Sequence, residues 1–249
     1  MKNRNILLIV EGETTEVEVF NKISALFFDK KTKLTFYPYK SNIYSLYQKI
    51  KDYEELTSTI EILKEIAPNK KMKSLLNINF SEIYLVFDFD PQEPAYSDTK
   101  IKKLVSLFNN ETEFGKLYIN YPMMESFRDH NNFDMLNYMS RMTCLEGLTS
   151  KNYKEYIKNS GYNKNLNNLT IRHFRKFSKL NIAKANYILN NSKNIPDYAD
   201  YYIVSNQKVI LDKQISQKNS NNKIFVLNTC MMFIVDYFGE KYYKDIQKS

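Results

Sequence analysis

Residues 6–20, ILLIVEGETTEVEVF, join an uninterrupted apolar run to a cluster of carboxylates. A run as short as residues 6–10 is typical of a β-strand that is buried on both faces. Glu11 follows the run directly, and Thr15 with Glu18 three residues later is the pattern of a capped helix start. The stretch therefore predicts a buried strand, an acidic turn and a helix in succession.

Similar apolar runs recur along the first half of the chain, at residues 83–87 and 117–121. Residues 33–39 alternate between apolar and polar side chains, which also indicates a strand. Helical spacing of apolar residues fills the intervals, notably at residues 43–66 and 99–108. Strands that alternate with helices predict an α/β fold: a mostly parallel sheet flanked by helices.

Strand signals fade after residue 123. Residues 123–140 and 171–190 show helical spacing. The apolar stretch 224–238 predicts a buried helix that ends at Gly239, and we expect it to pack in the chain's own core rather than against a partner. Residues 213–223, rich in Ser, Asn and Lys, predict a loop. The C-terminal half is therefore expected to be mainly helical.

These patterns predict two domains, 1–126 and 127–249, of which the second packs on the first. The net charge of +8 is concentrated in residues 151–190, where nine Lys and Arg face a single acid, Glu155. Tyrosine and phenylalanine alternate with these cations, a mixture that suits nucleic acid, although a solvated basic helix face is the alternative. The candidate nucleic-acid-binding residues are Arg172, Arg175, Lys176, Lys179 and Lys184.

Several protein classes are disfavoured by composition. Mean hydropathy is negative, and Asn228, Thr229 and Asp236 interrupt the longest apolar stretch, so we expect no membrane span. No signal peptide is recognisable at the start of the chain. The two cysteines lack metal-ligand spacing, and two histidines are too few for a histidine-rich metal site. These features predict a cytoplasmic protein.

Carboxylates follow three of the predicted strands: Glu11 after the first, Asp88 and Asp90 after the second and Glu125 after the third. Because functional groups of open α/β sheets lie beyond the carboxyl ends of strands, we expect these acids to meet at one edge of the sheet, joined by Glu16. Clustered carboxylates repel one another unless a cation is present. Oxygen ligands without Cys or His pairs favour Mg²⁺ or Mn²⁺, although solvated strand-end acids are the alternative.

An apolar strand ending in Glu-Gly, a helix, and a second strand ending in Asp-x-Asp together resemble the Toprim domain. Residues 6–16 match its first motif and residues 85–90 its second, and the resemblance covers residues 4–126. Glu16 and the Pro-x-x-Glu step at 122–125 make the chain most similar to small antiviral-defence nucleases, namely the OLD-like, RloB-like and PARIS-effector-like groups.

The resemblance implies a nuclease that cleaves phosphodiester bonds with one or two Mg²⁺ or Mn²⁺ ions. Its implied catalytic residues are Glu11, Asp88, Asp90 and Glu125, and Glu16 would be a further metal ligand. Glu16 stands five residues after Glu11, where the family commonly has four, so Glu13 is the alternative second acid. His130 is a candidate for proton transfer or an ordinary core or surface histidine.

The resemblance also implies a biological role. Related defence nucleases work with an ATPase, and this chain has no GxxxxGK[ST] loop, so the ATPase would be a separate protein. We expect a toxic effector of bacterial anti-phage defence (abortive infection) that acts on DNA or RNA, tRNA included, and that forms a homo-oligomer or a complex with its regulator. The alternatives are a non-catalytic nucleic-acid-binding or scaffold protein with a Toprim fold and a housekeeping RNA-processing nuclease.

Overall fold

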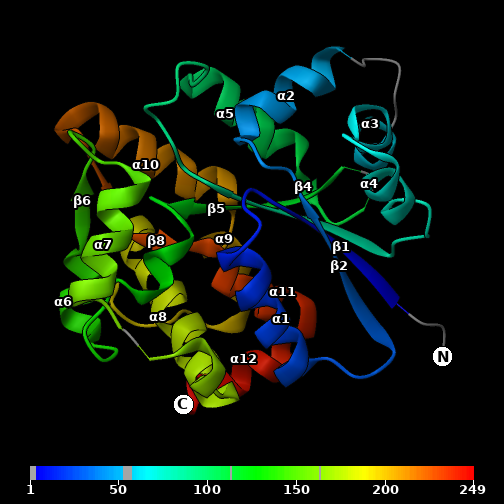
Figure 1. Ribbon diagram of the computed structural model, residues 1–249. Coiled ribbons are helices and arrows are strands. Elements are labelled where there is room, and N and C mark those ends of the chain that lie inside the picture. The colour runs from blue at the N-terminus through cyan, green and yellow to red at the C-terminus, as the bar shows by residue number, and fades with distance from the viewer. Residues whose placement is uncertain (1–3, 53–57, 113, 163) are drawn as a thin grey trace. The chain divides into compact units, whose positions relative to one another are not determined.

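The computed structural model describes residues 4–52, 58–112, 114–162 and 164–249 (Figure 1). It divides into two compact units, Met1–Tyr118 and Ile119–Ser249. The predicted boundary, after residue 126, lies beyond the observed one, which falls inside strand β5 (Gly115–Tyr121). The physical reason is that the end of β5 pairs with a strand of the second unit, Tyr121 with Leu227.

A mostly parallel sheet is the core of the first unit, as predicted. β1 lies between β2 and β3 and runs parallel to both. Ile6 to Val10 are fully buried, which explains why this strand is apolar on both faces. The strand order is β2 (Thr32–Pro38), β1 (Arg4–Val10), β3 (Glu82–Asp88), β5 and β4 (Asn109–Asn110).

Five helices accompany this sheet in the part of the first unit that the structure describes. Helix α1 lies on one side of strands β1 to β3, and α2 and α5 lie together on the other (Figure 1). The α/β fold is thus confirmed. The helices are α1 (Thr15–Phe27), α2 (Ile43–Asp52), α3 (Thr59–Ile66), α4 (Lys70–Leu75) and α5 (Asp98–Leu107).

Two predicted helix starts differ from the structure. The N-cap of α1 is Thr14 and makes no side-chain capping bond, so the predicted capping role of Thr15 is wrong. The single helix predicted at 43–66 is also wrong, because α3 has its own start at Ser58, whose hydroxyl accepts a hydrogen bond from Glu61 N–H. The intervening residues 53–57 lie outside the described residues.

The second unit is mainly helical, as predicted, and α8 (Ile171–Asn190) matches the predicted helix 171–190. Its apolar face is buried, including Phe174, Phe177 and Leu180. The other elements are η1 (Met124–Arg128), α6 (Met135–Ser140), β6 (Met142–Cys144), α7 (Ser150–Ser160), η2 (Leu166–Asn168), α9 (Tyr198–Val204), α10 (Gln207–Asn221), β7 (Lys223–Phe225), β8 (Leu227–Asn228), η3 (Thr229–Met232), α11 (Phe233–Phe238) and α12 (Glu240–Gln247).

Three predictions in this unit are corrected. Residues 123–140 contain only η1 and α6, separated by irregular chain. The stretch 224–238 is buried in its own unit, as expected, but it is not one helix: β7, β8 and η3 precede α11. The predicted loop 213–223 lies mostly in α10, whose Ile210, Leu211 and Ile215 are buried. Gly239 does end α11, with a positive φ of 67°.

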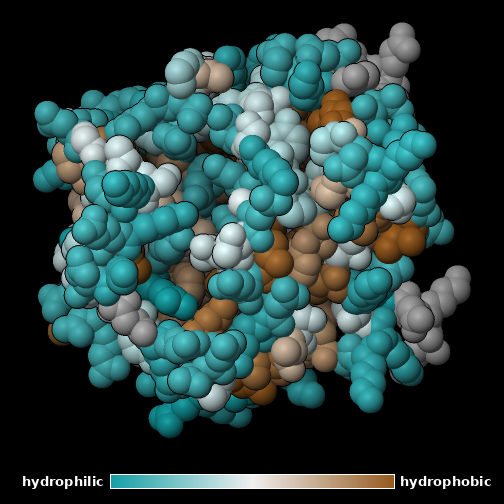
Figure 2. Space-filling model, in the orientation of Figure 1, coloured by the Kyte–Doolittle hydropathy of each residue, from teal (hydrophilic) through white to brown (hydrophobic). Residues whose placement is uncertain are grey.

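Among the described residues, no helix is both long and apolar enough to span a membrane. Hydrophilic residues cover most of the face shown in Figure 2, and hydrophobic residues occupy smaller areas of it. The large apolar side chains that are exposed include Leu136, Tyr202 and Ile203.

Candidate functional site

The structure brings Glu11 and Asp88 together, although they are 77 residues apart in sequence. Val10 pairs with Val86 in the parallel ladder, so β1 and β3 end side by side. The Asp88 N–H donates to Glu11 Oε2 at 3.0 Å, and the Glu11 N–H donates to the Val86 carbonyl at 3.2 Å. The carboxyl ends of two adjacent strands therefore present their acids at one edge, as the sequence predicted.

Of the two candidates for the second acid of the first motif, Glu16 is the one that lies close to Glu11. It is in the first turn of α1 and only 6% exposed. Its carboxylate lies over Gly12: a Cβ added there would be 2.9 Å from Glu16 Oε2. Glu13, by contrast, is exposed, and its carboxylate pairs with Lys40 at 2.5 Å. The alternatives left by the sequence are thus separated in space, since Glu16 turns inward and Glu13 outward.

The second motif presents its two acids as expected from extended backbone. Phe89 is 1% exposed and points into the core, while Asp88 and Asp90 are both half-buried. Asp90 Oδ1 also accepts a hydrogen bond from the Gln92 N–H at 3.2 Å, which shapes the turn after β3. The Asp-x-Asp spacing therefore directs both acids away from the core.

Burial raises the pKa of Glu11 to about 7. The hydrogen bond from Asp88 N–H opposes this rise, and the negative charges of Glu16, Asp90 and Glu93 add to it. At neutral pH Glu11 is therefore close to half protonated. A buried carboxyl with a raised pKa beside other acids is the electrostatic pattern of a cation site or of a proton-transferring carboxyl.

Glu93 is a site residue that sequence reasoning missed. Its charge acts on Glu11, and its Oε2 accepts a hydrogen bond from Asn42 Nδ2 at 2.9 Å. The signal was present in the sequence, because Glu93 follows Asp90 by three residues across the turn that begins at Pro91. Asn42 gave no signal, because it comes from the connection between β2 and α2.

The donor chemistry of these acids fits a hard divalent cation. The side chains of Glu11, Glu16, Asp88 and Asp90 offer carboxylate oxygens, which Mg²⁺ and Mn²⁺ prefer, and a cation would offset both the burial and the acidic neighbours that raise the pKa of Glu11. In the described part of the chain, however, no three or more His, Cys, Asp or Glu side chains are grouped as a ready-made metal site. The carboxylates Glu11, Glu16, Asp88 and Asp90 fit the ion by chemistry and electrostatics.

Glu125 belongs to the second unit, where it lies in the first turn of the 3-10 helix η1. Its side chain is 14% exposed, and its Oε1 lies 3.3 Å from Lys154 Nζ of α7. Asn228 holds this helix by donating to the Met124 carbonyl at 2.7 Å and to Ser126 Oγ at 3.1 Å. These contacts hold η1 and the side chain of Glu125 in place within the second unit. The participation of Glu125 in the acidic cluster stays a prediction.

His130 is a core residue rather than a surface one. It is 5% exposed, and the rings of Phe133, Tyr162 and Phe177 lie within 6 Å of its own. Burial lowers the pKa of His130 to about 4, so its imidazole is neutral at pH 7. The interpretation of His130 as an ordinary core histidine is therefore favoured over a proton-transfer role.

The predicted nucleic-acid-binding residues of α8 differ in how far contacts within the protein engage them. Arg172 is exposed, and Lys176 lies over the Phe133 ring at 5.1 Å. Arg175 pairs with Asp245, and Lys179 donates to the Ser249 carbonyl at 2.6 Å, so both anchor the C-terminal segment. These contacts leave Arg172 and Lys176 as the members of the set best placed for an external phosphate.

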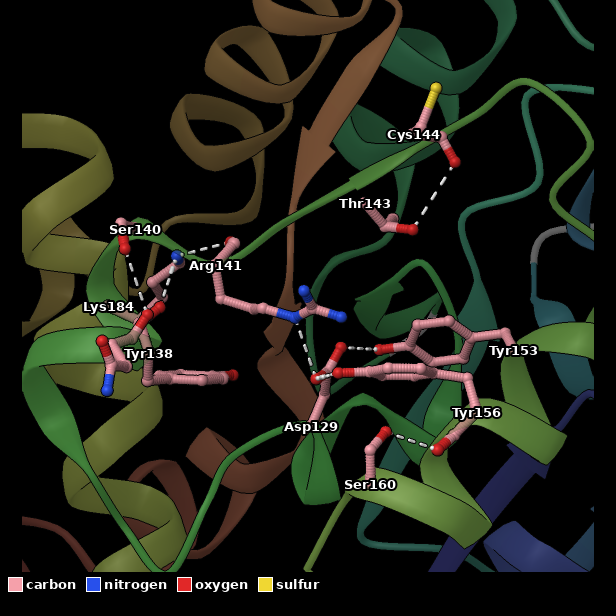
Figure 3. Close-up of polar contacts among 11 residues, drawn as sticks. Asp129, Tyr138, Ser140, Arg141, Thr143, Cys144, Tyr153, Tyr156, Ser160 and Lys184 are labelled. Atoms are coloured by element: carbon pink, nitrogen blue, oxygen red, sulfur yellow. Dashed lines mark hydrogen bonds and ion pairs between the residues drawn. The ribbon is translucent and has the colours of Figure 1, made fainter.

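The prediction for Lys184 is wrong, because its side chain is fully buried. Its ammonium donates to the carbonyls of Tyr138, Met139 and Arg141 at 2.8, 2.6 and 2.9 Å (Figure 3). Burial lowers the pKa of Lys184 to about 7, with a smaller contribution from the positive charge of Arg141, and the negative charge of Asp129 opposes this fall. Lys184 therefore caps the C-terminal turn of α6 and is unavailable to a ligand.

No protein-family model, curated protein or solved structure matches this chain. Any function assigned to it therefore rests on its own residues. Those are the acids at the ends of β1 and β3, the buried Glu16 and the distribution of charge between the two units.

Proposed function

We propose that this protein is a divalent-metal-dependent nuclease of the Toprim type. The observation that carries the proposal is the meeting of Glu11, at the end of β1, with Asp88, at the end of the neighbouring β3. The buried Glu16 and the half-buried Asp90 add further negative charge to this edge. Placing several acids close together costs free energy, because their negative charges repel one another. Their presence at this edge therefore supports a cation-dependent role over that of a passive scaffold.

Glu11, Glu16, Asp88 and Asp90 would hold the metal, and Glu93 would add negative charge beside them. When bound, Mg²⁺ or Mn²⁺ supplies charge stabilisation to the phosphodiester and lowers the pKa of a water molecule. The chain's own contribution is orientation: the Asp88 N–H fixes one oxygen of Glu11. A carboxyl whose pKa is near 7 is also suited to accept a proton at neutral pH.

The division of charge supports nucleic acid as the substrate. Residues 1–118 contain 17 Lys and Arg and 17 Asp and Glu, so their formal net charge is zero. Residues 119–249 contain 19 Lys and Arg against 11 Asp and Glu, which is the whole excess of +8. The neutral first unit holds the acidic cluster, which suits cleavage. The basic second unit suits the binding of phosphates.

The test is cleavage of plasmid, single-stranded DNA and total tRNA with Mn²⁺ or with EDTA. Asp88→Asn removes a proposed ligand, and we expect it to abolish cleavage while the protein stays folded. Glu18→Gln is the matched control, because Glu18 is an exposed acid of the same α1. Cleavage by Asp88→Asn at the wild-type rate, or equal cleavage in EDTA, would remove the proposal in favour of a non-catalytic nucleic-acid-binding protein.

The resemblance to defence nucleases extends the proposal to biology: a toxic effector restrained by a separate ATPase and released by phage infection. Expression of the wild-type chain alone should then slow bacterial growth, and the Glu11→Gln form should not. Equal growth with both forms, in a protein that cleaves nucleic acid in vitro, would favour a housekeeping RNA-processing enzyme.

A further inference from the structure

Arg141, between α6 and β6 in the second unit, is held in a fixed orientation by two neighbours. Its Nε donates to Asp129 Oδ1 at 3.0 Å, and its guanidinium lies over the Tyr156 ring at 4.8 Å (Figure 3). Burial alone would lower the pKa of Arg141, but the charge and hydrogen bond of Asp129 outweigh it and raise the pKa. The group is therefore both permanently charged and oriented.

The partner carboxylate is itself braced. Asp129 is 3% exposed, and besides Arg141 it accepts hydrogen bonds from the hydroxyls of Tyr153, at 2.8 Å, and Tyr156, at 3.4 Å. Tyr153 is buried, so the network has a rigid base in the core. Two tyrosine hydroxyls already donate to the buried carboxylate, so its position does not depend on Arg141. It therefore fixes the orientation of the guanidinium.

The outer edge of the guanidinium remains available. The side chain of Arg141 is 36% exposed, and neither terminal nitrogen donates a hydrogen bond to another described residue. Figure 3 shows the Asp129 contact at Nε and no contact from the two terminal nitrogens among the residues drawn. The two terminal nitrogens, coplanar and unengaged among the described residues, match two oxygens of one phosphate, which a lysine cannot match.

We propose that Arg141, oriented by Asp129 and Tyr156, binds a backbone phosphate of a nucleic-acid strand. The choice of a nucleic acid rests on the proposed function and on the net charge of +8 in residues 119–249. Tyr156 is 38% exposed, so it also offers the edge of an aromatic ring beside the phosphate. This contact was absent from the sequence-based candidates, which all lie in α8.

The experiment measures binding of fluorescein-labelled 12-nucleotide DNA and RNA by anisotropy in EDTA, where cleavage is absent. Arg141→Lys keeps the charge beside Asp129 but loses the planar pair of donors. We expect it to bind about tenfold more weakly with its melting temperature nearly unchanged. Arg141→Ala should also flatten the dependence of log Kd on log salt by about 0.7 to 0.9, the loss of one phosphate contact.

Lys208→Ala is the control, because Lys208 is an exposed cation of the same unit, on α10. It should leave the affinity within about twofold of wild type. If Arg141→Lys binds both strands as tightly as wild type, the proposal is overturned and Arg141 only pins α7 to its neighbours. Strand binding that depends on Arg141 without any cleavage in Mn²⁺ would uphold this inference and reject the nuclease.

Discussion

Replacing Glu11 by Gln should make the protein more stable at pH 8 and nearly unchanged at pH 5. The pKa of Glu11 is raised from 4.5 to about 7, chiefly by burial and then by its acidic neighbours. A difference of about 2.5 in pKa corresponds to about 3 kcal/mol of unfavourable ionisation. Gln has the same shape and keeps an oxygen that can accept the hydrogen bond from the Asp88 N–H.

The sign follows from proton binding. Between pH 4.5 and about 7 the folded protein holds a proton on Glu11 that the unfolded chain has lost, so wild-type stability falls as pH rises through this window. Above pH 7 the whole destabilisation is present. Glu11→Gln removes it, and the expected gain at pH 8 is at most about 3 kcal/mol in the free energy of unfolding.

The assay is urea denaturation at pH 5 and pH 8, in EDTA and in 5 mM Mg²⁺ (roughly the concentration that occupies sites of moderate affinity). In EDTA, Glu11→Gln should lose the fall in stability that wild type shows between the two pH values. In Mg²⁺, wild type at pH 8 should be stabilised and the variant should not. Glu18→Gln, an exposed acid on α1, should behave as wild type. Parallel pH profiles for wild type and Glu11→Gln would refute the assignment of a perturbed acid to this site.

Three further substitutions test other parts of the structure. Gly12→Ala places a Cβ 2.9 Å from Glu16 Oε2, the flexible end of a side chain that can move. The free energy of unfolding should therefore change by less than about 1 kcal/mol, while metal-dependent cleavage falls. Unchanged cleavage would argue against a role for Glu16. Lys184→Met removes the ammonium that donates to three carbonyls, of which those of Tyr138 and Arg141 keep a backbone N–H donor, and should cost about 2 kcal/mol of unfolding free energy in urea at pH 7. A cost near zero would show that the cap of α6 contributes little. Asn228→Ala removes the donor to Met124 and should destabilise the second unit by about 2 kcal/mol in thermal melts, a loss that Asn228→Asp would share if the donated bond matters.

The strands of the first unit could be predicted from sequence because burial on both faces demands continuous apolar runs. Residues 6–10 and 83–87 are such runs, and the acids after them mark the points where the strands leave the core. Helix α8 was equally clear, since its apolar residues recur at helical spacing over five turns. Local pattern and the rule that parallel strands end at a common edge were sufficient to place Glu11 and Asp88 together.

Local pattern failed where the tertiary context chooses between conformations. The run 224–238 is mostly apolar, and such a run fits a buried strand as well as a buried helix. Pairing of β7 with β6 and of β8 with β5 decided for strands at its start. The polar stretch 213–223 is mostly helical because Gln214 turns inward and bonds the main chain of Phe225 at both N–H and carbonyl. The pattern of one segment does not show which residues of other segments it will pair with.

Charge shows the same division between sequence and structure. The sequence alone establishes that the excess of +8 lies in the second half and that acids follow two buried strands. Only the tertiary structure distinguishes Lys184, buried and bonded to three carbonyls, from Arg141, whose side chain is partly exposed and engaged only through Nε and its guanidinium face. The physical reason is that composition counts charges, whereas the partners of a charge, brought from distant segments by folding, decide whether it supports the fold or remains available to a ligand.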